Sequence, residues 1–311
     1  MRSKLLAVGL AAGAILLSAC SDSLAPGEVS EEDRAEIEAI LAESGFFGED
    51  LGVEGATADA SGSAAFGAAV YLAPRDAQAE VIAPRIWGRR LRSPVRRAFN
   101  VEIVEGVATV TREIDFEGHF LLDISDDGQV NPTSKPLNVT MLQSAELVRL
   151  NADQVTDSGR RWRLVAVSPQ EWVMTDPARQ TLTIAQVLVY VNEELVLTIT
   201  DPGERHEVDG RIPLLHQEDV VRVEATVNEP DNGHTPEAFV FLHLFHASLD
   251  TRIWLRRPME EIEDGVYVRQ WTVRQTGRER IAVDAIDSQS FLTAEDDDYS
   301  GNVWAIPYRI L

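Results

Sequence analysis

The stretch that decides the fold is AFNVEIVEGVATVTREIDFEGHFLLDI, which occupies residues 98–124. Apolar and polar residues alternate along it, and a period of two is the pattern of a β-strand with one buried face. Glu105 and Gly106 interrupt the alternation, and a pair of residues that contains glycine between two such runs predicts a tight hairpin turn. We therefore expect two antiparallel strands, the second of them long.

The sequence before this hairpin predicts helices. Ser30 has the side chain of a helix N-cap, the three residues after it are acidic, and apolar residues then recur at helical spacing until Gly45. We also interpret Pro84 to Arg97 as a helix, broken near Pro94 because proline disrupts a helix interior.

The rest of the chain predicts strands. Residues 136–150 and 160–172 supply two more, and helices that precede an antiparallel sheet indicate an α+β layer. After residue 176, short alternating segments are separated by turn signals, which is typical of a β-sandwich. The predicted domains are an α+β domain over 30–175 and an all-β sandwich over 176–311.

The amino terminus has the anatomy of an export signal. Arg2 and Lys4 precede an uncharged apolar run over 5–17. This run is shorter than the ~20 apolar residues that a transmembrane helix needs. It leads into Leu17-Ser18-Ala19-Cys20, and Cys20 is the only cysteine of the chain.

This tetrapeptide resembles the lipobox of bacterial lipoproteins. In that family the cysteine sulfur receives a diacylglyceryl group, the peptide is cut just before the cysteine, and the new amino terminus is acylated. The resemblance implies a signal peptide over 1–19 and a lipidated tether over 20–29, of which residues 21–29 reach at most ~30 Å. Several acyl chains hold a protein stably on a membrane, so we expect the membrane to be a partner through lipid on Cys20. The alternative is an ordinary secretory signal with an incidental cysteine.

Ser21, directly after the cysteine, resembles the sorting signal for the outer membrane that some Gram-negative bacteria use. The resemblance therefore implies a protein of the bacterial cell envelope, held in the outer membrane by its lipid.

Two longer stretches also resemble known domains. Residues 30–175, which end in the strand at 161–168, resemble nuclear transport factor two-like (SnoaL-like) domains in the order of their elements. Residues 264–267, Trp271 and 283–287 resemble immunoglobulin-like or fibronectin-like envelope modules, although the paired cysteines of that family are absent. These resemblances imply an α+β cone-like N-terminal domain, which often holds a pocket in that family, followed by an all-β immunoglobulin-like sandwich.

The composition excludes two classes of interaction. Since Cys20 is the only cysteine, no internal disulfide can form. The chain has 28 basic and 51 acidic residues, a formal net charge of −23. A chain of this charge repels phosphate backbones, so we expect no nucleic-acid partner.

The long strand carries the candidates for catalysis. Alternation places Asp115, Glu117 and His119 on one face, where a carboxylate beside a histidine can act as a general acid–base pair if the face lines a cup. The alternative is a face exposed to solvent, as is common in antiparallel sheets. The predicted buried face consists of Ile114, Phe116, Phe120 and Leu122.

Metal-binding patterns are present but incomplete. His243 and His246 point to opposite faces of a strand and cannot share one ion, so we expect no zinc. Residues 123–134 match the first half of a calcium loop, but Ser134 stands where a bidentate glutamate is needed. Calcium is the one cofactor left open, and the alternative is two polar turns. Its candidate ligands are Asp123, Ser125, Asp127, Asp296 and Asp298.

Arginines crowd into residues 85–97 of this acidic chain. Arginine pairs well with phosphate and carboxylate, so the group could face anionic lipid headgroups or an acidic partner. The alternative is an exposed helix face neutralised by the protein's own acids. The anion-binding candidates are Arg89, Arg90, Arg92, Arg96 and Arg97.

The sequence contains no phosphate-binding glycine loop, no nucleophile elbow, no HExxH zinc motif and no dinucleotide fingerprint. We therefore predict a non-catalytic binding, adhesion or scaffolding protein whose partner is an envelope protein or glycan. The alternative is a small-ligand-binding protein or an enzyme with a pocket in the α+β domain. A deep pocket around Asp115 and His119 would favour that alternative, and a cup filled by Phe and Trp side chains would favour the binding protein.

Overall fold

The computed structural model shows a protein built mainly of β-strands. This confirms the β-rich fold that the alternating sequence predicts, and α1 (Glu31–Ser44) is the longest helix among the described residues. The structure describes residues 29–47, 86–123, 132–151, 153, 155, 159–229, 237–247, 252–274, 278–292 and 299–310.

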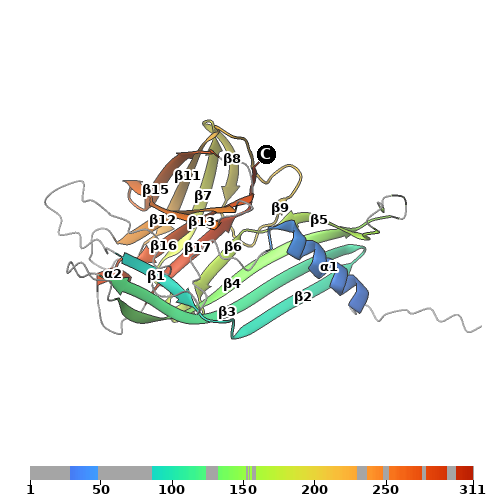
Figure 1. Ribbon diagram of the computed structural model, residues 1–311, viewed down its shortest axis with the longest axis horizontal. Coiled ribbons are helices and arrows are strands. Elements are labelled where there is room, and N and C mark those ends of the chain that lie inside the picture. The colour runs from blue at the N-terminus through green and yellow to red at the C-terminus, as the bar shows by residue number, and fades with distance from the viewer. Residues whose placement is uncertain are drawn as a thin grey trace, which may run out of the picture.

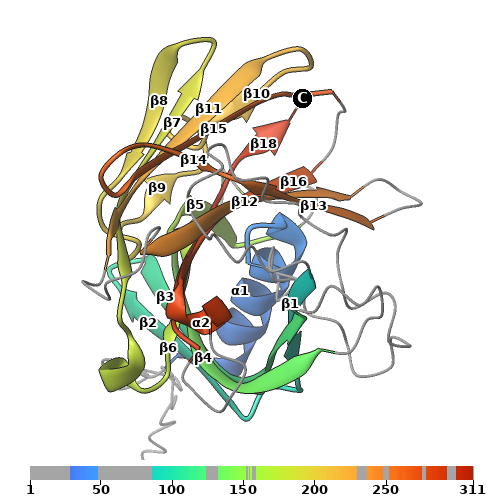
Figure 2. The ribbon, with the colours of Figure 1, turned by 90° about the vertical axis from the view of Figure 1, so that its left-hand side faces the viewer.

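An eleven-stranded antiparallel sheet forms the frame of the molecule (Figure 1). Its main path runs β1-β3-β4-β6-β17-β16-β12-β13, and β2, β5 and β9 join it at the sides. The sheet curves strongly (Figure 2), and the two ends of this path come close enough for the side chain of Arg256 of β13 to donate to the carbonyl oxygen of Trp87 of β1 at 3.1 Å. The strands are β1 (Ile86–Leu91), β2 (Arg96–Val104), β3 (Val107–Asp123), β4 (Thr133–Arg149), β5 (Trp162–Val167), β6 (Gln170–Met174), β9 (His206–Glu207), β12 (Ala238–Ala247), β13 (Arg252–Pro258), β16 (Arg278–Asp287) and β17 (Gly301–Ile306).

A second, five-stranded sheet in the order β14-β15-β11-β7-β8 packs against β12, β16 and β17. Val240 and Leu242 of β12 belong to the core shared with this sheet, whereas Phe239 and Phe241 face the interior of the curve. Burial on both faces explains why the first half of β12, residues 238–242, is a continuous apolar run. The remaining elements are η1 (Pro177–Arg179), β7 (Thr183–Val191), β8 (Glu194–Ile199), β10 (Leu214–Leu215), β11 (Val220–Asn228), β14 (Glu260–Glu263), β15 (Val266–Thr272), α2 (Gln289–Leu292) and β18 (Arg309–Ile310), with β10 and β18 paired in parallel.

One sheet continues across the predicted domain boundary at 175/176. The boundary lies between β6 and η1, and β6 pairs with β4 on one side and with β17 on the other. The five-stranded sheet, in contrast, is built only from residues after 176. The second half thus supplies a sandwich layer, and the two halves are joined through the large sheet.

The predicted hairpin is present. Glu105 and Gly106 connect β2 to β3 with φ angles of 50° and 81°, the left-handed backbone that a two-residue hairpin turn requires. β3 has 17 residues and pairs with β4 along nearly its whole length, from Val107 to Leu122. The even-numbered residues of β3 form its buried face, as the alternation predicts.

Helix α1 packs on this same face of β3 and β4. Ser30 caps it by accepting a hydrogen bond from the backbone N–H of Asp33, and Gly45 ends it in the left-handed conformation, so both predicted ends are confirmed. Ile37 and Leu41 are buried against the first half of β3, while the second half of β3 faces the interior of the curved sheet.

The prediction of a helix over 84–97 is wrong, because this stretch forms β1 and β2 within the described residues. β1 pairs with the second half of β3 and β2 with the first half, so both lie along one edge of the same long strand. Pro94 lies in the connection between them and does not break a helix. The pairing of β1 and β2 with β3, which comes later in the chain, outweighs the preference of the local sequence for a helix.

The close approach of β1 to Gly118 of β3 gives a test of this arrangement. A Cβ atom at Gly118 would overlap the carbonyl oxygen of Arg90 and come within 3.0 Å of the Cα of Leu91. Because this backbone is held in the sheet, Gly118→Ala is expected to lower the free energy of unfolding by about 1–3 kcal/mol. The exposed neighbour Glu117→Ala is the control and should change it by less than about 0.5 kcal/mol. Urea unfolding measures both, and equal stability of the two variants would contradict the close approach.

Candidate functional site

A charged cluster lies inside the curve of the large sheet. Arg89 of β1 donates two parallel hydrogen bonds of 2.7 Å to the carboxylate of Asp284 of β16, and its Nε donates to the hydroxyl of Tyr299 at 2.9 Å. The Nε2 atom of His243 of β12 lies 2.8 Å from Oδ2 of Asp284. None of the four side chains is more than 3% exposed. We call Arg89, Asp284, Tyr299 and His243 the interior cluster.

Strand alternation places these groups. On β1 the inward residues are Trp87, Arg89 and Leu91, and on β16 Asp284 stands between two apolar inward positions. His243 follows Phe239 and Phe241 on one face of β12. The side chain of His246 lies outside the described residues.

The interior cluster is arranged to keep its charges fixed. Burial alone would raise the pKa of Asp284, but the Arg89 guanidinium and the hydrogen bond with His243 hold that pKa well below its usual range. Burial, together with the negative charge of Asp284, raises the pKa of the Tyr299 hydroxyl to about 12. Both oxygens of Asp284 are engaged by nitrogen partners, so this carboxylate is ionised and already occupied.

Aromatic side chains fill the space around this cluster. The ring of Trp87 lies 4.9 Å from that of Phe241 and 5.6 Å from those of Phe120 and Phe291. The guanidinium of Arg256 lies 3.6 Å from the centre of the Trp87 ring, where the two ends of the sheet meet. The described part of the interior is thus packed mainly with apolar and aromatic side chains around the interior cluster, and Lys135 of β4 is a further charged side chain that is fully buried.

The three candidates for catalysis lie on the opposite face of β3. Asp115 accepts hydrogen bonds from Arg96 and, at 2.8 Å, from Thr140, and the bond from Arg96 holds the pKa of Asp115 below its usual value. His119 is four residues further along the strand, or ~13 Å at 3.3 Å per residue, so it cannot share a proton directly with Asp115. Glu117 between them is exposed. The structure therefore agrees with the solvent-facing alternative for this face.

The contacts of His119 also argue against a role as a base. Its Nε2 lies 3.2 Å from Nη2 of Arg92, and arginine can only donate, so Nε2 must accept. Nδ1 then carries the proton and donates to Oγ of Ser134 at 2.9 Å. A serine hydroxyl that accepts from histidine is not activated as a nucleophile.

The arginine group is not one surface. Arg89 is bound to Asp284 in the interior and is not available to an external anion, contrary to the expectation from sequence. Arg96 pairs with Glu113 and Asp115 of β3, which agrees with the alternative that the protein's own acids neutralise the group. The remaining candidates, exposed or half-buried, are Arg90, Arg92 and Arg97.

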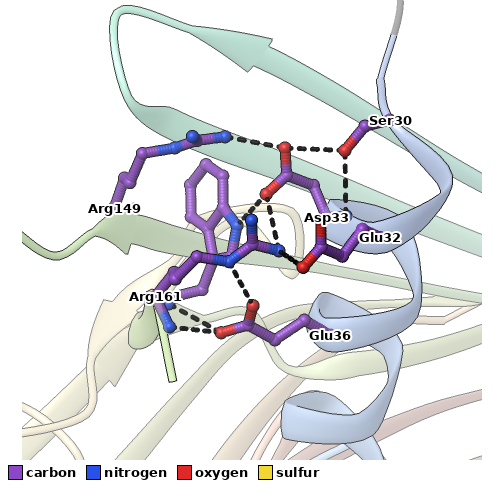
Figure 3. Close-up of polar contacts among 7 residues, drawn as sticks. Ser30, Glu32, Asp33, Glu36, Arg149 and Arg161 are labelled. Carbon is purple, nitrogen blue, oxygen red and sulfur yellow. Dashed lines mark hydrogen bonds and ion pairs between the residues drawn. The ribbon is translucent and has the colours of Figure 1, made fainter. Parts of the chain in front are cut away.

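A second set of polar contacts fixes the beginning of α1 to the sheet (Figure 3). Asp33, only 7% exposed, accepts hydrogen bonds from Nη2 of Arg149 at 2.7 Å, from Nε1 of Trp162 at 2.9 Å and from Ser30. Arg161 lies beside it and donates to Glu36 at 3.0 Å, and its Nη2 atom forms an ion pair with Glu32 at 3.3 Å. These contacts make up what we call the α1 clamp, which consists of Ser30, Glu32, Asp33, Glu36, Arg149, Arg161 and Trp162.

The calcium prediction rests mostly on residues that the structure does not describe. Asp123 lies at the end of β3 and is buried. The other candidate ligands, Ser125, Asp127, Asp296 and Asp298, fall outside the described residues, as does Cys20.

In the described part of the chain, one group of three carboxylates has ligand atoms within 4.8 Å of one another: Glu229, Glu261 and Asp264. Burial, reinforced by Glu261 and other nearby acids, raises the pKa of Glu229. Exposed acids of this kind are common without an ion, so the group is not assigned as a metal site.

Sequence reasoning missed the partners that hold both clusters together. Asp284 stands in IAVDAID, where an acid on a strand with two apolar faces must find a cation inside the protein. Arg89 likewise stands between two apolar residues, Trp87 and Leu91, each two positions away. The two patterns together could have predicted that Asp284 pairs with Arg89. No sequence signal joins Asp33 to Arg149, because Asp33 is one of three acids in the first turn of a helix, where acids are common without a basic partner.

Comparison with known proteins gives no relative for this chain: no family model matches it, and no curated protein matches it. Among the described residues, no helix combines the length and the apolar character needed to cross a membrane.

Removing the charge of Asp284 tests the interior cluster. Asp284→Asn leaves the Arg89 guanidinium buried without a counter-charge, so we expect it to lower the free energy of unfolding by about 3–5 kcal/mol. Glu113→Gln, which breaks an exposed ion pair with Arg96, should cost no more than about 1 kcal/mol. Urea unfolding compares the two. If Asp284→Asn does not fold, the double variant Arg89→Met/Asp284→Leu should, because it removes both charges, and equal losses for the two single variants would contradict the buried pair.

The α1 clamp should make the protein less stable in acid. Hydrogen bonds from Trp162 and Ser30 and the charge of Arg149 outweigh burial and lower the pKa of Asp33, so this group stabilises the fold fully above its unfolded pKa of about 4. The contribution is lost as the pH falls from there through the folded pKa. Asp33→Asn should therefore lose less stability than the wild type between about pH 6 and about pH 3 in urea unfolding. Exposed Glu31→Gln is the control and should keep the wild-type slope, and an unchanged slope in Asp33→Asn would contradict the prediction.

Proposed function

We propose that this protein is a bacterial envelope lipoprotein, anchored through Cys20, whose folded part binds or scaffolds an envelope protein or glycan and catalyses no reaction. The observation that carries the non-catalytic part is the filled interior. Trp87, Phe120, Phe241 and Phe291 occupy the curve of the sheet, and the charges of Arg89 and Asp284 neutralise each other there. A protein with a filled interior can bind a partner only on its outer surface. The acidic charge of the chain disfavours nucleic acid as that partner.

As part of this proposal, we infer that the two parts of the fold are similar to two known kinds of domain. One helix packed on a curved antiparallel sheet, as α1 packs on β3 and β4, is consistent with a cone-like domain of the nuclear transport factor two-like kind. A five-stranded sheet packed on β12, β16 and β17 is consistent with an immunoglobulin-like layer. Sandwiches of this type commonly serve as spacers or binding modules, so the likeness agrees with a scaffolding role.

The position of the α1 clamp supports the anchor. Residues 21–29 would separate a lipidated Cys20 from the Ser30 cap, and these residues span at most ~30 Å. A pull on such a tether reaches α1 at its first turn, where Asp33 binds Arg149 of β4 and Trp162 of β5. The tether is thereby coupled to the large sheet, which suits a protein held at a membrane, and Ser21 favours the outer membrane.

The alternative function, a small-ligand-binding protein or an enzyme, would need a pocket that encloses Asp115 and His119. These residues lie on the solvent face of β3 and hold separate partners, Arg96 and Ser134. No observation among the described residues favours that alternative.

Replacing the cysteine tests the anchor. Cys20→Ala is expected to move the protein from the membrane fraction to the soluble fraction of disrupted cells, because the acyl chains supply the membrane affinity. Ser23→Ala, in the tether but outside the lipobox, should stay with the membrane. The intact mass of membrane-extracted wild type should correspond to a chain that begins at Cys20 and carries acyl groups. Wild type that keeps its first nineteen residues, or is found in the cytosol without lipid, would contradict the proposal.

A further inference from the structure

Most sheet edges in the described part of the protein are covered or charged. The ends of the large sheet, β1 and β13, meet through Arg256. The edge of β2 carries the Arg34 side chain, which donates to the carbonyl oxygen of Phe99 at 3.2 Å. The edge strand β14 of the five-stranded sheet is short, and all but one of its residues is a glutamate. Charges and coverings of this kind prevent an edge from pairing with another chain.

Strand β8 is different. It is the opposite edge of the five-stranded sheet and, among the described residues, pairs only with β7. Its sequence is ELVLTI, with no charge after Glu194 and no proline. Leu195 and Val196 are 49% and 37% exposed, and a register shift in the pairing with β7 leaves these two apolar residues side by side at the surface. The regular part of the strand, Leu197 to Ile199, still presents a free edge.

The charges around β8 indicate which kind of strand could pair with this edge. Glu193 precedes the strand, Glu194 is its first residue, and Asp201 and Glu204 follow it. Within the described residues no ion pair involves any of the four, and Arg205, next to Glu204, pairs with Glu146 instead. A second copy paired antiparallel would bring the Glu193 end of one strand to the Asp201 end of the other, so like charges would meet at both ends. A strand with basic residues at both ends would instead meet opposite charges.

We propose that β8 is a docking edge for an extended segment of another protein, with β-branched or apolar residues in its centre and lysine or arginine at both ends. The segment adds a sixth strand by main-chain hydrogen bonds to Leu197–Ile199 and covers Leu195 and Val196 with its side chains. This inference rests on the proposed binding function and names the chemical class of its partner.

The test uses the full chain, purified in detergent, and a fluorescent peptide of sequence KKTVTVTVKK. Fluorescence anisotropy should show binding that weakens as salt is raised, because the flanking charges are exposed. The matched peptide EETVTVTVEE should bind at least about tenfold more weakly, a difference of about 1.4 kcal/mol. Amide exchange should slow at residues 197–199 when the basic peptide is added.

Variants on the two edges of the sheet locate the site. Leu195→Lys/Val196→Lys should weaken binding of the basic peptide at least about tenfold, since it adds charge and removes the apolar contact. Ile262→Lys, at an exposed apolar position on β14, is the control and should leave binding unchanged. Thermal melting of both variants confirms that they are folded.

Absence of binding, equal binding of the two peptides, equal loss in Ile262→Lys, or exchange protection confined to other strands would overturn the docking edge. None of these results bears on the lipid anchor, which the Cys20→Ala fractionation tests separately. Failure of this inference can therefore be told apart from failure of the anchor.

Discussion

The bidentate ion pair between Arg89 and Asp284 is the constraint on which the curved sheet depends. It joins β1 to β16 across the interior, between residues that are 195 positions apart in the chain. A buried charge without its partner costs several kcal/mol, so neither strand can shift along its neighbours without leaving a charge exposed to apolar side chains. Such a pair adds little net stability compared with apolar residues, but it fixes which part of each strand faces the interior. The contacts of His243 and Tyr299 follow from this pairing, because both bind groups that the pair has already placed.

Helix α1 is held in a different way, by polar contacts at both ends and apolar contacts between them. At its start the carboxylate of Asp33 gathers donors from β4 and β5. Just after its end, Arg112 of β3 donates to the carbonyl oxygen of Phe47 at 2.7 Å, and Gln143 of β4 donates to that of Phe46 at 2.9 Å. Carbonyl groups beyond the end of a helix have no partner within it, so these side chains satisfy groups that burial would otherwise penalise. Because α1 is tied to β4 and β5 at its start and to β3 and β4 after its end, it behaves as part of the sheet, and a tether attached to its first turn is attached to the whole frame.

Local signals predicted the elements whose form is decided locally. The Ser30 cap, the Gly45 stop and the Glu105–Gly106 turn are all present, because each depends on one or two residues and their own backbone. The stretch over 84–97 was predicted wrongly because its arginines and single proline suit an exposed helix, whereas pairing with a distant strand decides its conformation.

The candidate site was harder to predict for the same reason. Alternation correctly separated the face of Phe116 and Phe120 from that of Asp115 and His119, but it cannot say which face is enclosed, or by what. Arg89 stood in a group that looks like a surface patch, and its partner Asp284 comes almost two hundred residues later. Only the topology of the sheet brings the two together.

The distribution of charge in the folded protein follows from these pairings. Many arginines of the described part form ion pairs with the protein's own acids. Arg89 pairs with Asp284, Arg96 with Glu113 and Asp115, and Arg161 with Glu36. Since the chain has 51 acidic residues and only 28 basic ones, this internal pairing leaves the surplus entirely negative. The field that a partner meets is therefore set by acids outside these ion pairs, such as Glu193 and Glu194 at the start of β8 and Asp201 after its end, and it attracts cations while repelling phosphates. The acidic residues and the open edge thus occur at the same strand, β8. Together they restrict the chemistry of a partner more than either feature would alone.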